Sequence, residues 1–372
     1  MAVSKVGPTG LSSAVGQIGK NLIQNGAFRV AQRGTSFTGL GDASANPPTM
    51  DRWFHPEESD GGGRYTVAQE SGAGPGNGFT NQLSVHCTTA DGTLAAGILN
   101  LLEQRIEAKD LQHIMKGTAA AKALTMSFWV KSSQTGVMNV LIRAEDNSDR
   151  SYMHNYTINV ADTWEYKSFT IPGDTTGTIT NDTGIGLMVY FVLAAGSTFK
   201  GGTADAWATH NNNRYGTDQT VNVFASTDDD WSVTGVQLEV GSVATDFEHE
   251  PVSVTLAKCQ RYLFRINQPA SSYEAIGSGF ARISTQCIIS MHMDVPMRVE
   301  GTLSAGGTLA DIDNRRAGAA EDTTALSSYA PGTGVYLLAI TIGAGNFTVG
   351  EGVVSWIKGG SNSTFIQVTS EL

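Results

Sequence analysis

A polar and aromatic stretch, residues 207–215 (WATHNNNRY), carries the residue types best suited to binding a sugar. A sugar has an apolar ring face, which aromatic side chains contact, and a rim of hydroxyls, which Asn, Asp, Arg and His bind. The stretch lies in a region with few strand signals, where loops commonly carry binding residues. The candidate glycan-binding residues are Trp207, His210, Asn211, Arg214 and Tyr215. The alternative is a surface or interchain loop without a ligand.

Motifs of known enzyme classes are missing from the sequence. The histidines lack the HExxH spacing of a zinc hydrolase, and no serine stands in a GxSxG elbow. Residues 14–21 (AVGQIGKN) imitate a phosphate-binding loop, but Ala14 replaces its first glycine and Asn21 its magnesium-binding hydroxyl. Residues 72–78 (GAGPGNG) join two strand-like runs and open no helix, which indicates a hairpin loop. A glycosidase needs only two carboxylates, and no pair stands out, so we expect no enzyme activity and no cofactor.

The acidic run at residues 228–230 (DDD) is the one candidate for binding a metal ion. Clustered carboxylates suit a hard cation such as calcium. The run lacks the spaced ligands and the glycine of a calcium loop, so a solvated acidic turn before a strand is the favoured interpretation. We therefore expect no metal site.

The overall charge limits the kinds of partner. The 372 residues include 35 acidic and 24 basic side chains, a formal net charge of -11, and no basic cluster. Phosphate binding draws on concentrated Lys and Arg, so we expect no nucleic acid partner. No apolar run is long enough to span a bilayer, and residues 1–20 do not read as a secretory signal. Three cysteines without a CxxC motif indicate a reducing compartment and no disulfides.

Short alternating segments separated by turns predict an all-β protein. The chain has 43 glycines and ten prolines, which favour many turns over long helices. In residues 124–133 (LTMSFWVKSS), Met126, Phe128 and Val130 share one face of a strand, while Ser127, Trp129 and Lys131 share the other. Residues 186–196 (GLMVYFVLAAG) are apolar on both faces, which predicts a strand covered on both sides. Three tryptophans lie in segments with a strand-like pattern and are predicted to be core residues: Trp53, Trp164 and Trp231.

The alternating pattern of apolar and polar residues ends within residues 236–262. In the strand before this joint, Trp231 and Val233 have odd numbers whereas Val236 and Leu238 have even ones. Keeping all four on one face requires an extra residue, so we predict a β-bulge near Gly235. Residues 251–266 then predict a short connector helix, and the last hundred residues are long enough for a second, smaller β-sandwich.

Several motifs together resemble a family of bacteriophage structural proteins, namely tail fibre, receptor-binding or appendage proteins with a carbohydrate-binding-module-like jelly roll. The motifs are NLIQNGAFRVAQRGTSF (21–37), DRW (51–53), LTMSFWVKSS (124–133), FTIPGD (169–174) and VQLEVGSVATDFEHEPVSVTLAKCQRY (236–262). The resemblance implies a jelly roll, a linker helix and a C-terminal β domain, commonly in trimers. Sugar-binding members of the family often have, at the end of a strand, paired acidic residues that help hold calcium. Residues 234–239 (TGVQLE) occupy that place here and lack the pair, so we expect no calcium.

The resemblance divides the chain and gives each part an expected role. Residues 1–20 are expected to anchor the chain in a virion, residues 21–250 to form the jelly roll, residues 251–266 the connector helix and residues 267–372 the C-terminal domain. The expected protein is a homotrimeric tail fibre or appendage that attaches the phage to its host, with a surface glycan as the ligand. It would assemble in the host cytoplasm and remain in the virion, without membrane insertion. The alternatives are a capsid head fibre and a polysaccharide depolymerase.

Overall fold

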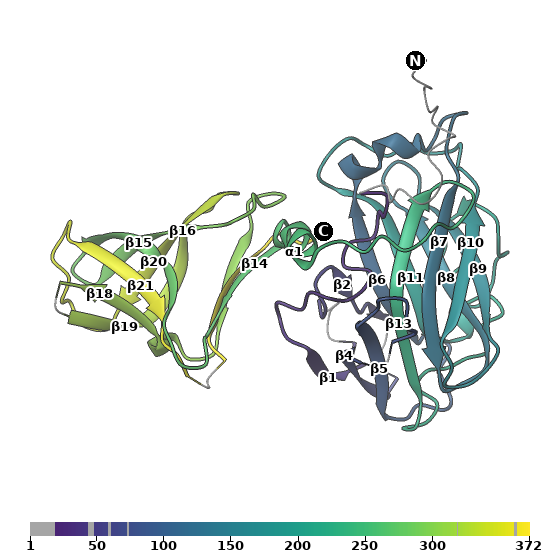
Figure 1. Cartoon of the computed structure of the whole chain (residues 1–372), viewed down its shortest axis with the longest axis horizontal. Coiled ribbons are helices and arrows are strands. Elements are labelled where there is room, and N and C mark those ends of the chain that lie inside the picture. The colour runs from purple at the N-terminus through teal and green to yellow at the C-terminus, as the bar shows by residue number, and fades with distance from the viewer. Residues whose placement is uncertain (1–18, 44–47, 59–60, 73, 318, 361–362) are drawn as a thin grey trace, which may run out of the picture. The chain divides into compact units, whose positions relative to one another are not determined.

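A computed structural model of the chain describes residues 19–43, 48–58, 61–72, 74–317, 319–360 and 363–372. These residues form two compact units that divide between Thr255 and Leu256, inside the helix α1 (Val252–Gln260) (Figure 1). No helix within the described residues is both long and apolar enough to cross a membrane. The predicted anchoring segment, residues 1–20, lies outside the described residues apart from its last two positions.

The first unit is a sandwich of two antiparallel sheets, which we call sheet A and sheet B. In spatial order, sheet A holds β1 (Ser36–Leu40), β4 (Arg64–Ser71), β5 (Asn81–Thr89), β13 (Asp230–Val240), β7 (Leu124–Ser132) and β10 (Glu165–Ile171). Sheet B holds β12 (Ala208–Thr209), β9 (Arg150–Ile158), β8 (Gly136–Ala144), β11 (Ile185–Ala195), β6 (Leu99–Glu107) and β2 (Trp53–Phe54), and β3 (Glu57–Glu58) pairs with β6. Short 3-10 turns occur at η1 (Ala108–Ile114) and η2 (Ser197–Phe199). The predicted jelly-roll sandwich is confirmed.

Aromatic side chains fill the space between the two sheets. Trp53, Phe128, Phe191 and Trp231 are fully buried. The Phe191 ring centroid lies 5.0 Å from that of Phe128 and 5.6 Å from that of Trp231, so strands of both sheets meet at one ring. Trp53 and Trp231 are core residues, as predicted. Trp164 is only half-buried and lies just before β10, so the prediction of a core position was wrong for this residue.

Strand β13 carries the predicted bulge at Gly235. Its pairing with β7 shifts register between Thr234 and Gln237. Gly235 has a φ of +63°, a left-handed conformation that glycine adopts without a steric penalty. The extra residue brings Val236 and Leu238 to the buried face of the strand, so the bulge is confirmed.

The segment that contains Phe199 and Tyr215 covers the outer face of sheet B. Tyr190 and Val192 of β11 point away from the main core and yet are buried. They pack in a second cluster that includes Phe199 and Tyr215 from the covering segment. The strand predicted to be covered on both faces therefore has the other sheet on one side and this segment on the other.

The second unit combines a closed barrel with a three-stranded sheet. Around the barrel the strands are β15 (Glu274–Ile283), β16 (Gln286–His292), β20 (Val335–Ile342), β19 (Ala319–Ala330), β18 (Ile312–Arg316) and β21 (Gly352–Ile357). The small sheet holds β14 (Leu263–Asn267), β22 (Phe365–Thr369) and β17 (Thr302–Gly306), and η3 (Leu309–Asp311) precedes β18. The all-β class is confirmed. Closure into a barrel was not predicted, because the alternation of residues along single strands does not show whether the last strand of a sheet pairs with the first.

The connector helix is shorter than predicted. Helix α1 ends at Gln260, and β14 begins at Leu263, so the helix predicted over residues 251–266 is correct only in its first part. Pro251 stands just before α1, and its carbonyl accepts hydrogen bonds from the first turn. The last predicted helical residues are instead a strand, because β14 pairs along its whole length with β22.

The two ends of the second unit lie side by side. Leu263 stands opposite Thr369 in the pairing of β14 with β22. Just outside this pair, the Ser370 backbone N–H donates to the Tyr262 carbonyl at 2.8 Å. The chain thus enters and leaves this unit through adjacent antiparallel strands.

Candidate functional site

The outer face of sheet A is polar. Alternate side chains of β13, β7 and β10 point away from the apolar core on this face. They are Ser232, Thr234, Gln237 and Glu239 of β13, Thr125, Ser127, Trp129 and Lys131 of β7, and Tyr166, Ser168 and Thr170 of β10. Hydroxyl, amide and carboxyl groups therefore lie beside two aromatic rings, the combination that small-ligand sites use for orientation and apolar contact.

Trp129 and Tyr166 are direct neighbours on this face. They stand opposite each other in the pairing of β7 with β10, with ring centroids 5.3 Å apart and ring planes at 54°. Tyr166 is 46% exposed and Trp129 is half-buried. Ser127 and Ser168 form the next outward pair along the same two strands. Ser168 is exposed, whereas Ser127 is buried, so the result is an aromatic surface with one accessible hydroxyl beside it.

The segment after β13, residues 243–249, forms a second wall. Glu239 accepts hydrogen bonds from the Thr245 backbone N–H at 2.8 Å and from its hydroxyl at 2.6 Å. Gln237 accepts one from the Glu248 backbone N–H at 2.9 Å. Glu239 and Gln237 are buried, so leaving these bonds unmade would be costly. The polar groups at the end of β13 thus fix the wall in place.

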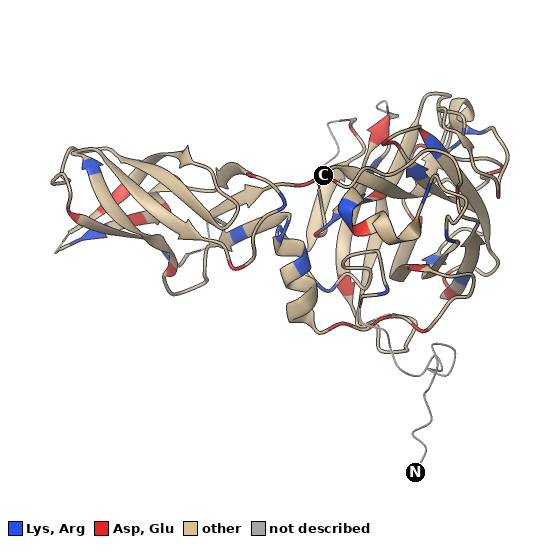
Figure 2. Ribbon diagram, turned by 90° about the horizontal axis from the view of Figure 1, so that it is seen from above, with Lys and Arg blue, Asp and Glu red and all other residues tan. Residues whose placement is uncertain are grey.

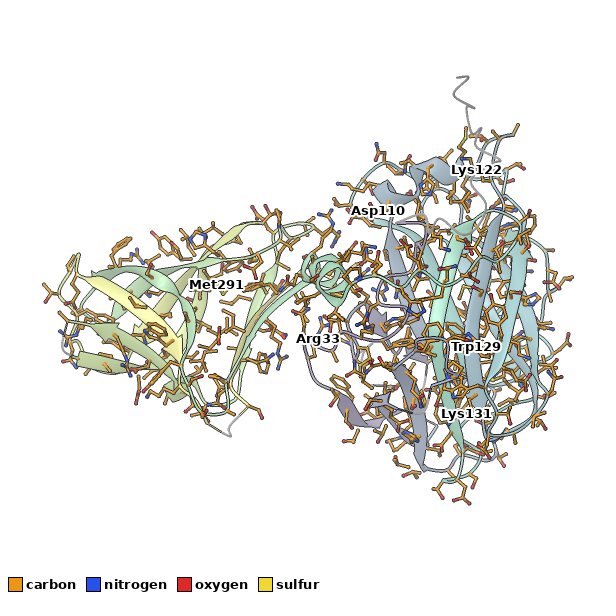
Figure 3. The ribbon with its side chains drawn as sticks, viewed as in Figure 1. Arg33, Asp110, Lys122, Trp129, Lys131 and Met291 are labelled. Carbon is orange, nitrogen blue, oxygen red and sulfur yellow. The ribbon has the colours of Figure 1, made fainter. Side chains whose placement is uncertain are left out.

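An open groove of about 890 Å³ lies between this segment and strands β7 and β10. Part of its lining is an aromatic cluster in which each ring of Phe79, Phe247 and His249 lies 5.0 Å from the other two. Other lining residues are Trp129, Tyr166, Ser127, Ser168, Asn77 and Asp246. Trp129 is labelled in Figure 3. The size falls within the range of about 300–1,000 Å³ found for small-ligand sites.

A charged network occupies the same sheet face on β4, β5 and β13. Nε2 of His86 lies 2.8 Å from a Glu70 oxygen, and Nδ1 lies 2.5 Å from an Asp230 oxygen. Burial opposes protonation of His86, but hydrogen bonds and charges from Asp230 and Glu70 outweigh it and raise its pKa. The Ser84 hydroxyl connects Glu70 (2.8 Å) with the Ser232 hydroxyl (2.9 Å). The imidazolium therefore offsets part of the carboxylate charge on this face.

The predicted glycan-binding residues lie elsewhere, in the segment that packs on sheet B. Tyr215 is 8% exposed and belongs to the cluster over β11. Arg214 is 4% exposed, and its guanidinium donates to the Ser151 hydroxyl at 3.0 Å and to the Ala206 carbonyl at 2.9 Å. A sugar stacks only on an accessible ring, so neither Tyr215 nor Arg214 presents a binding surface. These side chains instead cover the apolar outer face of the sheet.

The other three predicted residues have different surroundings. Trp207 is half-buried, and its indole N–H donates to the Pro172 carbonyl at 2.7 Å. His210 is buried, and burial lowers its pKa to about 4. Asn211 is exposed, and its side-chain oxygen accepts a hydrogen bond from the backbone N–H two residues further on, at 3.2 Å. Of the five predicted residues, only Asn211 is exposed, so the structure gives them no common accessible surface.

The acidic run at residues 228–230 is tied into the fold. The Asp229 carboxylate accepts hydrogen bonds from the Ser226 backbone N–H at 2.7 Å and from the Gln134 side chain at 2.5 Å. Asp230 bonds to His86, as described above. No group of three or more His, Cys, Asp or Glu side chains suited to a metal ion occurs in the part of the chain that the structure describes.

Trp129 and Tyr166 were not among the binding residues predicted from the sequence, although one signal pointed to Trp129 as a candidate. Residues 124–133 place Trp129 between two polar residues on the outward face of an alternating strand. A large aromatic residue on the polar face of a strand is a candidate for ligand contact, because exposing its apolar surface to water is energetically unfavourable. The sequence does not say that Tyr166 pairs opposite it, since strand pairing is long-range.

Comparisons with known proteins return solved structures alone. No family model matches the sequence, and no curated protein matches it. A tailspike protein 4 enzymatically active domain of bacteriophage CBA120 is 12% identical over 60% of this chain, with a TM-score of 0.31. A family 4 carbohydrate-binding module is 17% identical over 59% of this chain and 99% of its own length, with a TM-score of 0.28. A family 11 carbohydrate-binding module of a Clostridium thermocellum cellulase is 13% identical over 57% of this chain and 96% of its own length, with a TM-score of 0.27.

These similarities are distant. The chain spans only 22% of the tailspike domain's length. The identities and TM-scores are too low to carry a ligand or a biological role from these proteins to this chain.

Proposed function

We propose that the first unit binds a saccharide in the groove beside Trp129 and Tyr166. The observation that supports this most is the ring pair of Trp129 and the exposed Tyr166, with the exposed Ser168 alongside it. The apolar face of a sugar ring packs against the aromatic rings, and the sugar hydroxyls bond to the Ser168 hydroxyl and to the polar groups of the opposite wall. The hydrogen bonds that hold the wall keep these groups in position before a ligand arrives.

We further propose that the chain is a bacteriophage virion protein that attaches the particle to a host surface glycan. Support comes from the motifs at residues 21–37, 169–174 and 236–262, which resemble phage tail fibre and appendage proteins. In this proposal the N-terminal segment binds other virion proteins, and assembly takes place in the host cytoplasm. A capsid head fibre is the alternative within the same class. Antibody labelling of intact particles, viewed by electron microscopy, distinguishes tail from head, and absence of label from the particle would contradict both.

A homotrimer would make such attachment effective. A single open groove desolvates only part of a sugar, so its affinity is modest. Linked copies raise the effective concentration at the second and third sites, which strengthens binding to a repetitive surface. Light scattering of the purified full chain measures the assembly state directly, and a stable monomer would contradict the trimer.

Polysaccharide cleavage is the second candidate, and the pair Glu70 and Asp230 is the observation that favours it. Glycoside hydrolysis uses two carboxyl groups on either side of the scissile bond. Here both carboxylates bond to the same imidazole of His86, which occupies the space between them. We therefore propose binding without cleavage. Release of shorter products from a bound oligosaccharide by the wild type, and its loss in Glu70→Gln, would reverse this choice.

Two substitutions test the groove itself. We expect Trp129→Ala and Tyr166→Ala each to weaken oligosaccharide binding about tenfold or more, equivalent to about 1.4 kcal/mol, because each removes a stacking surface. Tyr273→Ala is the matched control, since this tyrosine of the second unit is 49% exposed and lies outside the groove. A glycan array followed by calorimetry on the strongest ligand provides the measurement. Wild-type affinity in Trp129→Ala, with loss in Trp207→Ala, would return the site to residues 207–215.

A further inference from the structure

Lys131 occupies the next outward position after Trp129 along β7; both residues are labelled in Figure 3. Its side chain is half-buried, and its ammonium lies 5.7 Å from the centroid of the Trp164 ring. It forms no ion pair with a carboxylate in the part of the chain that the structure describes. The indole face attracts the ammonium and leaves its N–H donors available to a ligand.

This arrangement differs from that of comparable cations in the first unit. Those cations bond to an acceptor in the protein. Some bond to a carboxylate, as Arg143 does with Asp149 at 2.7 Å and Arg150 with Asp174 at 2.7 Å. Others bond to a carbonyl, as Lys200 does with Gln219 at 2.8 Å. The chain has 35 acidic and 24 basic residues, and Figure 2 shows acidic residues spread over both units. A partly buried ammonium without a carboxylate partner, beside a groove, leaves a favourable place for an external anion.

We propose that the saccharide carries a carboxylate, as a uronic or sialic acid does, and that Lys131 binds it. This inference rests on the proposed saccharide-binding function. Outward positions on one strand are about 6.6–6.8 Å apart, so a sugar stacked on Trp129 brings its neighbour in the oligosaccharide to the ammonium. Ser232 stands opposite Lys131 in the pairing of β13 with β7, but its buried hydroxyl bonds to Ser84, so Lys131 is the donor that faces the ligand there.

Acidic groups on the same face orient the ligand. Asp246 lines the groove, and its carboxylate repels an anion there. Asp230 and Glu70 lie beyond Ser232 on the same face, but both carboxylates bond to His86, whose raised pKa favours a positive charge that offsets one of the two. The carboxylate of the saccharide is therefore favoured at the Lys131 end and disfavoured at the Asp246 end, so the saccharide binds in one direction.

The test compares native bacterial surface polysaccharides with the same polysaccharides after chemical reduction of their carboxyl groups to alcohols. The full-length protein is assayed against both sets on an array at low salt, and the strongest ligand is measured by calorimetry. We expect about tenfold weaker binding after reduction, the same loss in Lys131→Gln, and most of the affinity retained in Lys131→Arg. Lys122→Gln is the control, because Lys122 is exposed and precedes β7, seven residues from Trp129, whereas Lys131 is the next outward residue after it. The preference for the acidic form should also fall at high salt, since salt screens an accessible ion pair.

The outcomes separate this inference from the proposed function. Binding that survives carboxyl reduction and Lys131→Gln, but is lost in Trp129→Ala, would overturn the carboxylate while leaving saccharide binding intact. Binding that depends on Lys131 but survives reduction would point to a phosphate-bearing glycan and would also overturn it. Binding to no polysaccharide in either set would overturn both proposals. Sialylated and uronic-acid oligosaccharides on the same array identify which carboxylate is bound.

Discussion

Replacing His55 by leucine should remove a pH-dependent part of the stability of the first unit. His55 directly follows β2 and is fully buried, and neither ring nitrogen has a hydrogen-bond partner among the described residues. Burial lowers its pKa from 6.5 to about 3. Unfolding exposes the imidazole and restores its ordinary pKa, so the unfolded state takes up a proton first as the pH falls.

The size of the effect follows from this difference in pKa. A histidine with a lowered pKa in the folded state contributes stability above pH 6.5, and this contribution is lost as the pH falls toward 3. At about 1.4 kcal/mol per pH unit below 6.5, the loss attributable to His55 between pH 7 and pH 5 is about 2 kcal/mol. His55→Leu should lack this loss. At pH 7 it should be at least as stable as the wild type, because it no longer buries unpartnered nitrogens.

Urea unfolding followed by tryptophan fluorescence at pH 7, 6 and 5 measures the effect. The signal reports mainly on the first unit, which contains five of the six tryptophans: Trp53, Trp129, Trp164, Trp207 and Trp231. The control, His113→Leu, removes an exposed histidine of η1 and should leave the pH dependence of the wild type unchanged. Equal losses of stability between pH 7 and pH 5 in His55→Leu and the wild type would refute a neutral, buried imidazole at this position.

Three further predictions follow from single positions. Gly235→Ala should destabilise the first unit by about 1–3 kcal/mol in thermal unfolding, because φ is positive and the new Cβ would lie 2.6 Å from the Phe79 ring. The control, Gly241→Ala, should lower the stability less, because no atom lies within 4 Å of its new Cβ. Equal losses of stability in the two variants would exclude the clash with Phe79. Asp174→Asn should cost about 3–5 kcal/mol in urea unfolding, because it leaves two partly or fully buried cations without their carboxylate; an unchanged midpoint would contradict this. The Cys287 thiol, with its pKa raised by burial to about 12, should react with a disulfide reagent at pH 8 only after unfolding, and peptide mapping of labelled native protein would reveal any earlier reaction.

Local signals in the sequence identified the strands and the bulge well. The change of parity between Val233 and Val236 located the bulge, because a one-residue shift moves every later side chain to the opposite face. The connector helix was predicted too long, since residues 261–266 have no local signal that separates a helix from a strand. Their state is decided by β22, about a hundred residues further along the chain.

The exposure of residues 207–215 was predicted wrongly for a related reason. The stretch at residues 207–215 has the composition of an exposed binding loop, but Tyr215 covers the outer face of β11. The sequence of β11 is apolar on both faces, which already indicated that another segment covers its outer face. Residues 207–215 contain the aromatic Tyr215 that does so. Trp129 and Tyr166 come together only through the register of β7 and β10, and this register is set by packing rather than by either strand alone.

The adjacent ends of the second unit bear on how this chain could diversify. Because β14 and β22 run antiparallel side by side, both ends of the second unit occupy one spot, an arrangement that lets a domain with adjacent ends take its place without moving its neighbours. Recombination at the joint would exchange the whole second unit and leave the sandwich and its groove untouched. Homologues that keep the joint at residues 236–262 but carry an unrelated module after it are therefore the expected evolutionary trace of this architecture.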